Sequence, residues 1–375
     1  MPSLKKDVTQ VYWQPLDKLL APDTARTQSL KGFDDEFIDI TDYIIRITHR
    51  IWEQKNVGLC FDYYGEICPV YTLGAYSESV DLVVQNTLKT IAAFPDRSLI
   101  GENVIWNDEG DDTYYSSHLI TSIMTNSGDS EFGPATNKTG RVTTIADCVC
   151  KENRIIEEWL VRDNSFLVKQ LGIKPIDAAK KVANNAVHPT FTKWYASEYE
   201  RVINHDHRKD VAKGDEYTNL DEFNAKQFAQ SWQQTIFNQK QFSKLVDYYH
   251  LNASLQWPGG RNALGVAQIS GTIIQWLAQC PDCKLTFDHI GITYFDEHTC
   301  DIAVRWALAG THSPQITELE HTRGDKFFVL GATHLKVHKG KIAKEITVFD
   351  EIALMANLLR TQQQSFAHLG GKLDV

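Results

Sequence analysis

The sequence lacks any long apolar segment. None of its 375 residues lies in a run that approaches the ~18 uninterrupted apolar residues of a membrane-spanning helix. The opening stretch, MPSLKKDVTQVYWQPLDK, also lacks the apolar core of a secretory signal peptide. We therefore expect a cytoplasmic protein with no membrane partner.

Clusters of basic residues are missing as well. Lys and Arg together number 38 against 48 Asp and Glu, and the formal net charge is −10. Proteins that bind nucleic acid neutralise phosphates with basic side chains, so we expect no nucleic-acid partner. The chain is also longer than the ~250–300 residues at which a single hydrophobic core stops growing, which favours two domains.

Cysteines are few and odd in number. Seven thiols in a chain without an export signal indicate reduced cysteines rather than a disulfide framework. Cys280 and Cys283 enclose Pro-Asp and, together with Cys148 and Cys150, also fit a redox pair or a four-sulfur zinc site. For His205-Asp206-His207, a solvated loop is favoured over a metal site because the surrounding stretch is highly charged.

Two parts of the chain repeat each other. WEQKNVGLCFDYYG (52–65) and FNQKQFSKLVDYYH (237–250) both end in Asp-Tyr-Tyr, and NRIIEEWLVRD (153–163) matches GKIAKEITVFD (340–350). Similarity over so long a period indicates two whole domains from a duplication rather than a solenoid of short repeats. The repeat places Cys280 where the first copy has Phe94, which favours packing over metal or redox chemistry. We therefore expect no metal site.

Each copy has the same order of secondary-structure signals. In the first, Ile44, Ile47 and Ile51 recur at helical spacing, and a further helix is predicted near 77–94. Helices followed by an antiparallel meander predict an α+β domain, present twice. The strands are predicted near 99–106, 113–125, 141–150 and 154–162. The predicted parts are an N-terminal arm (1–40), a first domain (41–172), a partly helical connector (173–220) and a second domain (221–375).

An aspartate ends the last predicted strand of each copy. Because side chains alternate along a strand, Asp163 is expected to share a mostly apolar face with Ile155 and Trp159, and Asp350 with Ile346. A carboxylate in such a place loses hydration, which raises its pKa and suits a general base that abstracts a proton next to a carbonyl. The following segments look helical, and Asp is also a favoured helix N-cap. Both roles stay open at this point.

Other side chains are candidates for the same chemistry. His118 lies in a predicted strand, and the second copy has Arg305 at the same offset; either side chain is able to donate a hydrogen bond to a developing oxyanion. A strand histidine is more often a paired structural residue. Asp147, matched by His334, is expected to face away from the apolar set of its strand. The aromatic candidates for lining a pocket, with core packing as the alternative, are Trp106, Trp159 and Tyr64.

Two segments resemble a known family. GRVTTIADCVCKENRIIEEWLVRDNSFLVKQLG (140–172) resembles the C-terminal signature of the SnoaL-like polyketide cyclases, within the nuclear-transport-factor-two-like superfamily. IAVRWALAGTHSP (302–314), which contains Arg305 and Trp306, is similar to the central strand of that family. The resemblance implies two cone-shaped domains, each a curved antiparallel sheet wrapped around helices with an apolar pocket. Such domains commonly pair through their sheets, so we expect an internal pseudo-dimer, which could itself form homo-oligomers.

The resemblance also implies a chemistry. In the cyclases an aspartate at the position of Asp163 acts as acid and base in an intramolecular aldol condensation without metal or cofactor. The first hypothesis is thus a cofactor-independent enzyme that cyclises, isomerises or dehydrates a small apolar or carbonyl-containing ligand, with His118 stabilising the enolate. The second copy keeps Asp350 but has Ile346 in place of Trp159. The superfamily also holds non-enzymatic proteins, so the second hypothesis is a ligand-binding or scaffold protein of the same fold. The expected ligand-binding side chains are Trp159, Trp106, Tyr64, Arg305 and Trp306.

Overall fold

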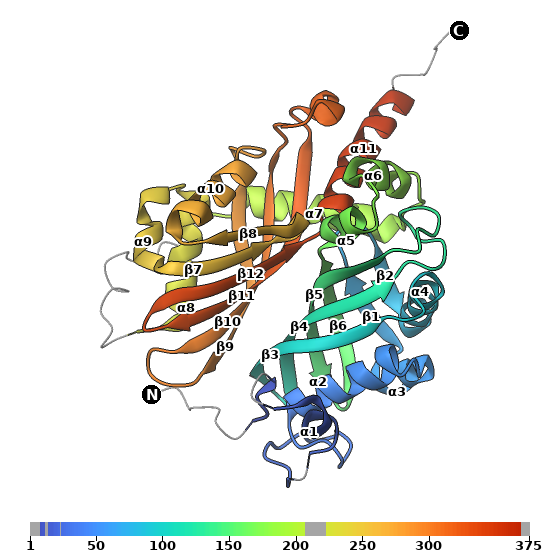
Figure 1. The fold of residues 1–375 in the computed structure, drawn as a ribbon, viewed down its shortest axis with the longest axis vertical. Coiled ribbons are helices and arrows are strands. Elements are labelled where there is room, and N and C mark those ends of the chain that lie inside the picture. Colours follow the sequence, from blue (N-terminus) through green and yellow to red (C-terminus); the bar gives the residue numbers. More distant parts are fainter. Residues whose placement is uncertain (1–7, 12–13, 23, 207–222, 369–375) are drawn as a thin grey trace.

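The chain forms two six-stranded sheets that face each other, with most helices on their outer sides (Figure 1). The computed structural model describes residues 8–11, 14–22, 24–206 and 223–368. No helix within these ranges is long and apolar enough to cross a membrane. His207 of the proposed His-Asp-His loop falls outside them.

The two halves repeat the same elements. The strand order is β2-β1-β6-β5-β4-β3 in one sheet and β8-β7-β12-β11-β10-β9 in the other, which confirms the expected α+β duplication. The strands of the first half are β1 (Ile67–Tyr71), β2 (Tyr76–Ser79), β3 (Ser98–Gly110), β4 (Thr113–Thr125), β5 (Thr139–Lys151) and β6 (Arg154–Arg162). Those of the second half are β7 (Tyr249–Trp257), β8 (Arg261–Leu264), β9 (Lys284–Tyr294), β10 (Cys300–Thr311), β11 (Lys326–His338) and β12 (Lys341–Phe349).

Helices precede and follow each sheet, and two more join the halves. Those of the first half are α1 (Leu16–Leu20), α2 (Ile40–Thr48), α3 (Cys60–Tyr63), α4 (Val80–Ala93) and α5 (Asn164–Gln170). The joining helices are α6 (Pro175–Ala183) and α7 (Pro189–Asn204). Those of the second half are α8 (Ala225–Trp232), α9 (Leu245–Tyr248), α10 (Val266–Leu277) and α11 (Glu351–His368). A π-helical turn extends both α2 (His49–Glu53) and α8 (Gln233–Asn238), a further sign of common origin.

The sheets are mixed rather than fully antiparallel. β1 runs parallel to β6, and β7 runs parallel to β12, while all other pairs are antiparallel. The sequence analysis missed β1 and β2 because β1 is short and contains Pro69, a residue that argues against a strand. The expected antiparallel meander is therefore correct for β3 to β6 and incomplete at the other edge.

A bulge follows the tight turn between β5 and β6. Glu152 and Asn153 both have positive φ angles (47° and 66°), as a two-residue hairpin turn requires. Cys150 then pairs with Ile155, but Val149 pairs with Glu157, so one residue of β6 is left over. This shift places Ile155 on one face of the sheet and Glu157, Trp159 and Val161 on the other. The expected unbroken row along β6 is therefore wrong, and the second half has the same irregularity.

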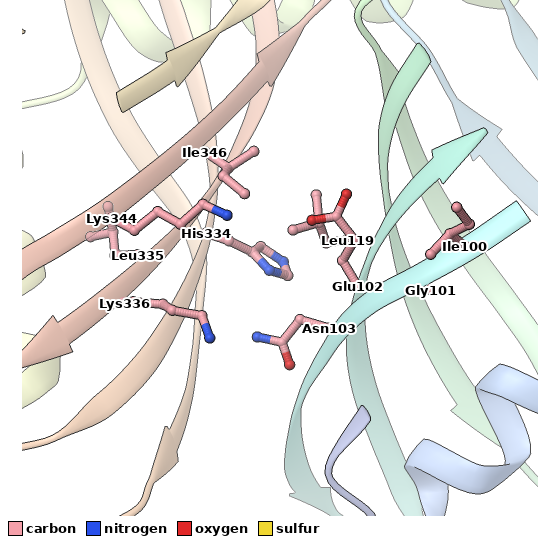
Figure 2. A pocket seen from close by; sticks show the side chains of 10 residues that line it. All are labelled: Ile100, Gly101, Glu102, Asn103, Leu119, His334, Leu335, Lys336, Lys344 and Ile346. Carbon is pink, nitrogen blue, oxygen red and sulfur yellow. The ribbon is translucent and has the colours of Figure 1, made fainter. Parts of the chain in front are cut away.

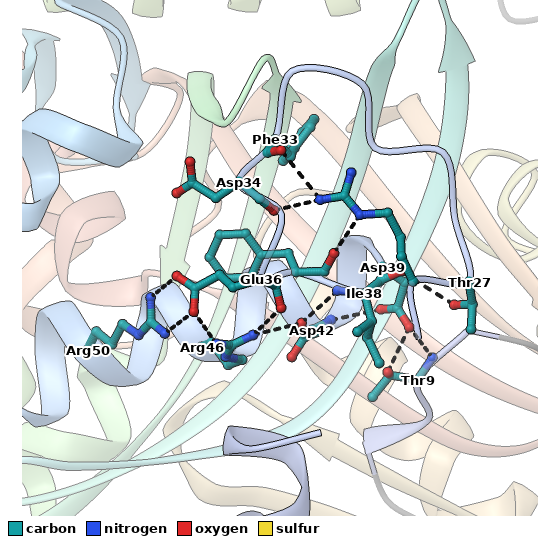
Figure 3. A network of polar contacts seen from close by, with 12 residues as sticks. Thr9, Thr27, Phe33, Asp34, Glu36, Ile38, Asp39, Asp42, Arg46 and Arg50 are labelled. Carbon is teal, nitrogen blue, oxygen red and sulfur yellow. Dashed lines mark hydrogen bonds and ion pairs between the residues drawn. The ribbon is translucent and has the colours of Figure 1, made fainter. Parts of the chain in front are cut away.

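The N-terminal arm is part of the first half. Asp39 caps α2, where its carboxylate accepts hydrogen bonds from the backbone N–H groups of Asp42 (2.8 Å) and Thr9 (2.7 Å) (Figure 3). Arg50 donates two hydrogen bonds to Glu36, both of 2.7 Å. The apolar side chains of the arm also join the core of the first half. The arm is thus held to α2 by both polar and apolar contacts.

The connector helices attach to both halves. Arg360 of α11 donates a hydrogen bond to the carbonyl of Val182 in α6 (2.6 Å). In α7, the ring of Trp194 lies 5.2 Å from that of Tyr71 in the first half and 5.4 Å from that of Phe328 in the second. These contacts tie the halves together beyond the packing of their sheets.

The facing surfaces of the two sheets are joined by polar contacts. Asn107 donates to the Ile290 carbonyl (3.0 Å) and accepts from the Ile292 N–H (3.2 Å). Gln256 donates to the Thr143 hydroxyl at 3.0 Å. The sheets therefore form the internal pseudo-dimer that the sequence predicts.

Candidate functional site

Asp163 caps α5 and links the two halves. Its Oδ1 accepts hydrogen bonds from the Phe166 N–H (2.9 Å), the Ser165 hydroxyl (2.9 Å) and the Gly259 N–H of the second half (2.8 Å). Burial raises the pKa of this carboxyl, while the three donors act in the opposite direction. Asp163 lines neither of the two cavities described below.

Asp350 lies at the same junction. Its carboxylate accepts hydrogen bonds from the N–H groups of Ile352 (2.9 Å) and Ala353 (3.0 Å) at the start of α11, and from the Asn164 amide of the first half (2.5 Å). Burial raises its pKa to about 7. Both aspartates therefore have the geometry of helix caps, the second of the two roles that the sequence left open.

His118 faces the interior of the first half from β4. A side chain added at Gly101 would lie 2.9 Å from Ile45 and 3.0 Å from His118 Nε2, which shows how tightly the ring is enclosed. Burial lowers the pKa of His118 to about 3, so the ring is neutral. Its Nε2 has no hydrogen-bond partner among the described residues.

The strand pairing corrects one expected equivalence. An offset of 187 positions relates β5 to β11, but an offset of 186 relates β4 to β10. The paired residues that show this are Asp147 with Ser117 in the first half, and His334 with Ala303 in the second. Arg305 therefore corresponds to Leu119, not to His118. Arg305 and Leu119 point to the junction between the sheets, whereas His118 points away from it.

Each half buries a glutamate that the sequence analysis did not single out. Glu158 accepts a hydrogen bond from the Tyr64 hydroxyl at 3.0 Å, and Glu345 accepts one from the Tyr249 hydroxyl at 2.5 Å. Burial raises the pKa of both carboxyls. A signal existed, because both copies keep the glutamate in the last strand and the second tyrosine of Asp-Tyr-Tyr. The bulge in β6 hid it, since simple alternation from Ile155 assigned Glu158 to the wrong face.

Glu345 lies beside an aromatic cavity inside the second half. It also accepts hydrogen bonds from the Trp257 indole (2.6 Å) and the Thr347 hydroxyl (2.7 Å). The cavity has a volume of about 20 Å³, enough for one water molecule. Trp306 lines it and donates to the Thr333 hydroxyl at 3.0 Å. The other lining residues are Trp232, Phe237, Trp257, Trp276, Leu285, Phe287, Thr347 and Phe349.

The remaining aromatic candidates are divided between two places. Trp106 and Tyr64 are buried in the core of the first half, where Trp106 packs near Tyr114. Trp159 instead lies at the junction of the sheets, and the Arg305 guanidinium carbon is 3.3 Å from its ring centre. The sequence-predicted site residues are thus not brought together in one pocket.

A larger cavity lies between the two sheets. We call it the cleft; its volume is about 300 Å³, and Figure 2 shows His334, Lys344 and Asn103 directed into it from the two sheets. Ser117 of β4 contacts the second-half wall through a 2.8 Å hydrogen bond between its hydroxyl and His334 Nε2. The wall from the first half consists of Ile100, Gly101, Glu102, Asn103 and Leu119, and the wall from the second half of His334, Leu335, Lys336, Lys344 and Ile346.

The equivalent place on the other side of the junction is filled. There, Arg305 stands at the position of Leu119, and Trp159 at the position of Ile346. Arg305 stacks on Trp159 and donates to the Tyr115 hydroxyl at 3.0 Å. We call this place the filled side. At these two positions the cleft therefore has smaller side chains than the filled side.

Metal ligands are not gathered anywhere in the described part of the chain. No group of three or more His, Cys, Asp or Glu side chains there is arranged to hold a metal ion. All seven cysteines are buried and free, and Cys280 and Cys283 pack into the core of the second half.

Comparison with known proteins agrees with this architecture. Two sheets of identical order, each with its own helices, define a tandem α+β protein. In the second half, residues 227–358 match the family model for SnoaL-like polyketide cyclase. No curated protein matches the chain.

Several solved structures resemble one half of the chain. IdmH from Streptomyces antibioticus is 17% identical and TsrD from Streptomyces laurentii 13% identical, with TM-scores of 0.31 and 0.32. A SnoaL-like polyketide cyclase from Agrobacterium tumefaciens is 16% identical, with a TM-score of 0.30. Each match covers 36% of this chain, and covers 98%, 95% and 96% of the respective structures.

Proposed function

We propose that the protein binds a small molecule in the cleft between its two sheets and that binding, rather than catalysis, is its function. The observation that carries this proposal is the volume of the cleft, about 300 Å³, which reaches the lower end of the ~300–1,000 Å³ typical of ligand sites. The cleft also combines apolar walls with a few converging polar groups, as such sites do. The cavity inside the second half is far smaller, about 20 Å³.

The positions of the candidate acids support binding over catalysis. Asp163 and Asp350 are engaged as helix caps at the junction. His118 is enclosed in the core of the first half. A general base needs to reach the proton that it abstracts, and none of these three side chains lines the cleft.

A second candidate function is acid–base chemistry on a small carbonyl compound inside the second half. One observation favours it: Glu345, with a raised pKa, lies beside the aromatic cavity and is surrounded by the donors Tyr249, Trp257 and Thr347. A carboxylate that such donors hold beside an apolar cavity is suited to act as the general base that abstracts a proton next to a carbonyl. This function requires the aromatic lining to move apart to admit a substrate.

One experiment separates the two candidates. Crystals of the full chain are soaked with 4-bromobenzyl alcohol, and the bromine is located by anomalous scattering. Binding to the wild type and to Ile346→Trp is measured in solution by ligand-observed NMR. A bromine peak in the cleft, with binding lost in Ile346→Trp, supports the proposal. A peak beside Glu345, with binding kept in Ile346→Trp, overturns it in favour of the second candidate.

A further inference from the structure

Two lysines face each other across the wall of the cleft. Lys336 and Lys344 are direct partners in the pairing of β11 and β12, and like charges placed directly opposite each other destabilise a sheet. On its other side, Lys336 lies opposite Asp301 of β10. On its other side, Lys344 lies opposite Ser254 of β7. Lys344 therefore has no acidic residue opposite it on either side. Figure 2 shows both amino groups directed toward the space between the sheets.

His334 adds a buried donor to the same wall. It is only 5% exposed, and its ring points into the cleft between the lysines and the first half (Figure 2). When the Ser117 hydroxyl donates to Nε2, the proton of the neutral ring is on Nδ1. Nδ1 has no hydrogen-bond partner among the described residues. The second-half wall thus presents Lys344, Lys336 with Asp301 opposite it, and a buried ring nitrogen of His334 that has no partner among the described residues.

The opposite wall carries one acid. Glu102 lines the cleft from β3, and its Oε1 accepts a hydrogen bond from the Thr121 hydroxyl at 2.5 Å. Asn103 beside it donates to Asp301 at 2.7 Å. Both polar side chains of this wall are therefore already engaged. Because Asp301 lies opposite Lys336, Lys344 is the lysine of the cleft that has no acid opposite it on a neighbouring strand.

The filled side has the opposite charge at the position of Lys344. Its wall has Asp147 where the cleft has His334, and Glu157 where the cleft has Lys344. The group that occupies it is a cation, Arg305, whose charge opposes the rise in the pKa of Glu157 that burial causes. An acidic wall thus surrounds a cationic occupant that stacks on an apolar ring. By charge complementarity, Lys344 in the place of Glu157 suits an anionic occupant with an apolar body.

We propose that the cleft binds a small monocarboxylate whose anionic group is held by Lys344 next to His334 and whose apolar body packs on Ile100, Leu119 and Ile346. This inference rests on the proposed function of the cleft as the ligand site, and it adds the class of ligand. A carboxylate accepts charge-assisted hydrogen bonds from ammonium and imidazole groups.

Two probes of similar size test the class of ligand, 4-bromobenzoate and the uncharged 4-bromobenzyl alcohol. Their affinities for the full chain are measured by ligand-observed NMR at pH 7. Lys344→Glu, which introduces the charge of its counterpart Glu157, is expected to weaken 4-bromobenzoate binding by ~10-fold or more and to change alcohol binding by less than ~3-fold. The matched control is Lys339→Glu. Lys339 lies in a hairpin turn outside the cleft, and its counterpart in the first half is Glu152. This control makes the same charge change and is expected to leave both affinities unaltered.

The outcomes separate this inference from the proposed function. If both probes bind equally well and Lys344→Glu changes neither affinity, the anionic class is wrong, while loss of binding in Ile346→Trp still supports the cleft as the site. If Ile346→Trp leaves both affinities intact, the proposed function fails as well. Inorganic phosphate that binds as tightly as 4-bromobenzoate would overturn the requirement for an apolar body. If neither probe binds the wild type at millimolar concentration, the inference is rejected.

Discussion

The Tyr64 hydroxyl and the Glu158 carboxylate are joined by a hydrogen bond of 3.0 Å in the interior of the first half, and the second half repeats this pair with Tyr249 and Glu345. No other described residue donates to Glu158, whereas Glu345 also accepts from Trp257 and Thr347. The two pairs have a common origin and unequal surroundings.

Removal of the Tyr64 hydroxyl is expected to destabilise the first half. Tyr64→Phe leaves a buried carboxyl without its donor and should lower the free energy of unfolding by about 1–3 kcal/mol. Urea denaturation followed by circular dichroism measures the change. The control is Tyr63→Phe, whose hydroxyl only accepts a 3.3 Å hydrogen bond from Arg50. A loss no larger than that of the control would show that Glu158 does not depend on Tyr64.

Asp350 should make the stability of the protein depend on pH. Its pKa is about 7 in the folded chain and about 3.9 in the unfolded chain, so between about pH 4 and pH 7 the folded chain keeps a proton that the unfolded chain releases. Stability therefore falls as pH rises through this range. Asp350→Asn keeps the cap and removes the titration. Its free energy of unfolding relative to the wild type should therefore rise by about 4 kcal/mol between pH 4 and pH 8.

Urea denaturation across the pH range tests this expectation. Asp247→Asn, an exposed carboxyl beside Lys244, serves as the control. Parallel curves for Asp350→Asn and the wild type would contradict the assignment.

Asp163 is expected to act through its acceptor atom. Asp163→Ala removes the cap of α5 and the hydrogen bond from Gly259, and should cost about 2–3 kcal/mol in the free energy of unfolding. Asp163→Asn keeps a side-chain oxygen and should cost less than about 1 kcal/mol. Thermal and urea denaturation compare the two variants. Equal losses would mean that the negative charge, and not the cap geometry, is what the junction requires.

The filled side should open when it is given the side chains of the cleft. The double variant Trp159→Ile, Arg305→Leu introduces the residues found at positions 346 and 119. Loss of the stacked pair should cost about 3–5 kcal/mol in the free energy of unfolding. A crystal structure is expected to show a second cavity opposite the first. A collapsed junction without a cavity would show that the open cleft depends on more than these two positions.

Sequence reasoning predicted the parts of this fold that follow from periodicity and repetition. The duplication, the α+β class and the strands β3 to β6 were readable because alternation and turn residues are local signals. β1 was missed because Pro69 argues against a strand, and the parallel pairing of β1 with β6 depends on a partner far away in the sequence.

The candidate site was less accessible from the sequence. The bulge in β6 inserts one extra residue, so simple alternation from Ile155 gives the wrong face for every residue after it. Glu158 was overlooked for this reason. The cleft could not be predicted because its walls come from different halves. Its volume also depends on the small side chain of Ile346, which stands where the filled side has Trp159. A comparison of the two copies for changes in size and charge would have pointed to these positions.

The covalent link between the halves determines how many clefts a molecule can have. In a homodimer of identical subunits, a two-fold axis makes both sides of the junction the same, so such a site occurs twice or not at all. Here the two sides are encoded separately, and Arg305 on Trp159 closes one while Leu119 and Ile346 leave the other open. A molecule that enters the cleft therefore binds with a stoichiometry of one per chain, and cooperativity between paired sites of one molecule cannot arise.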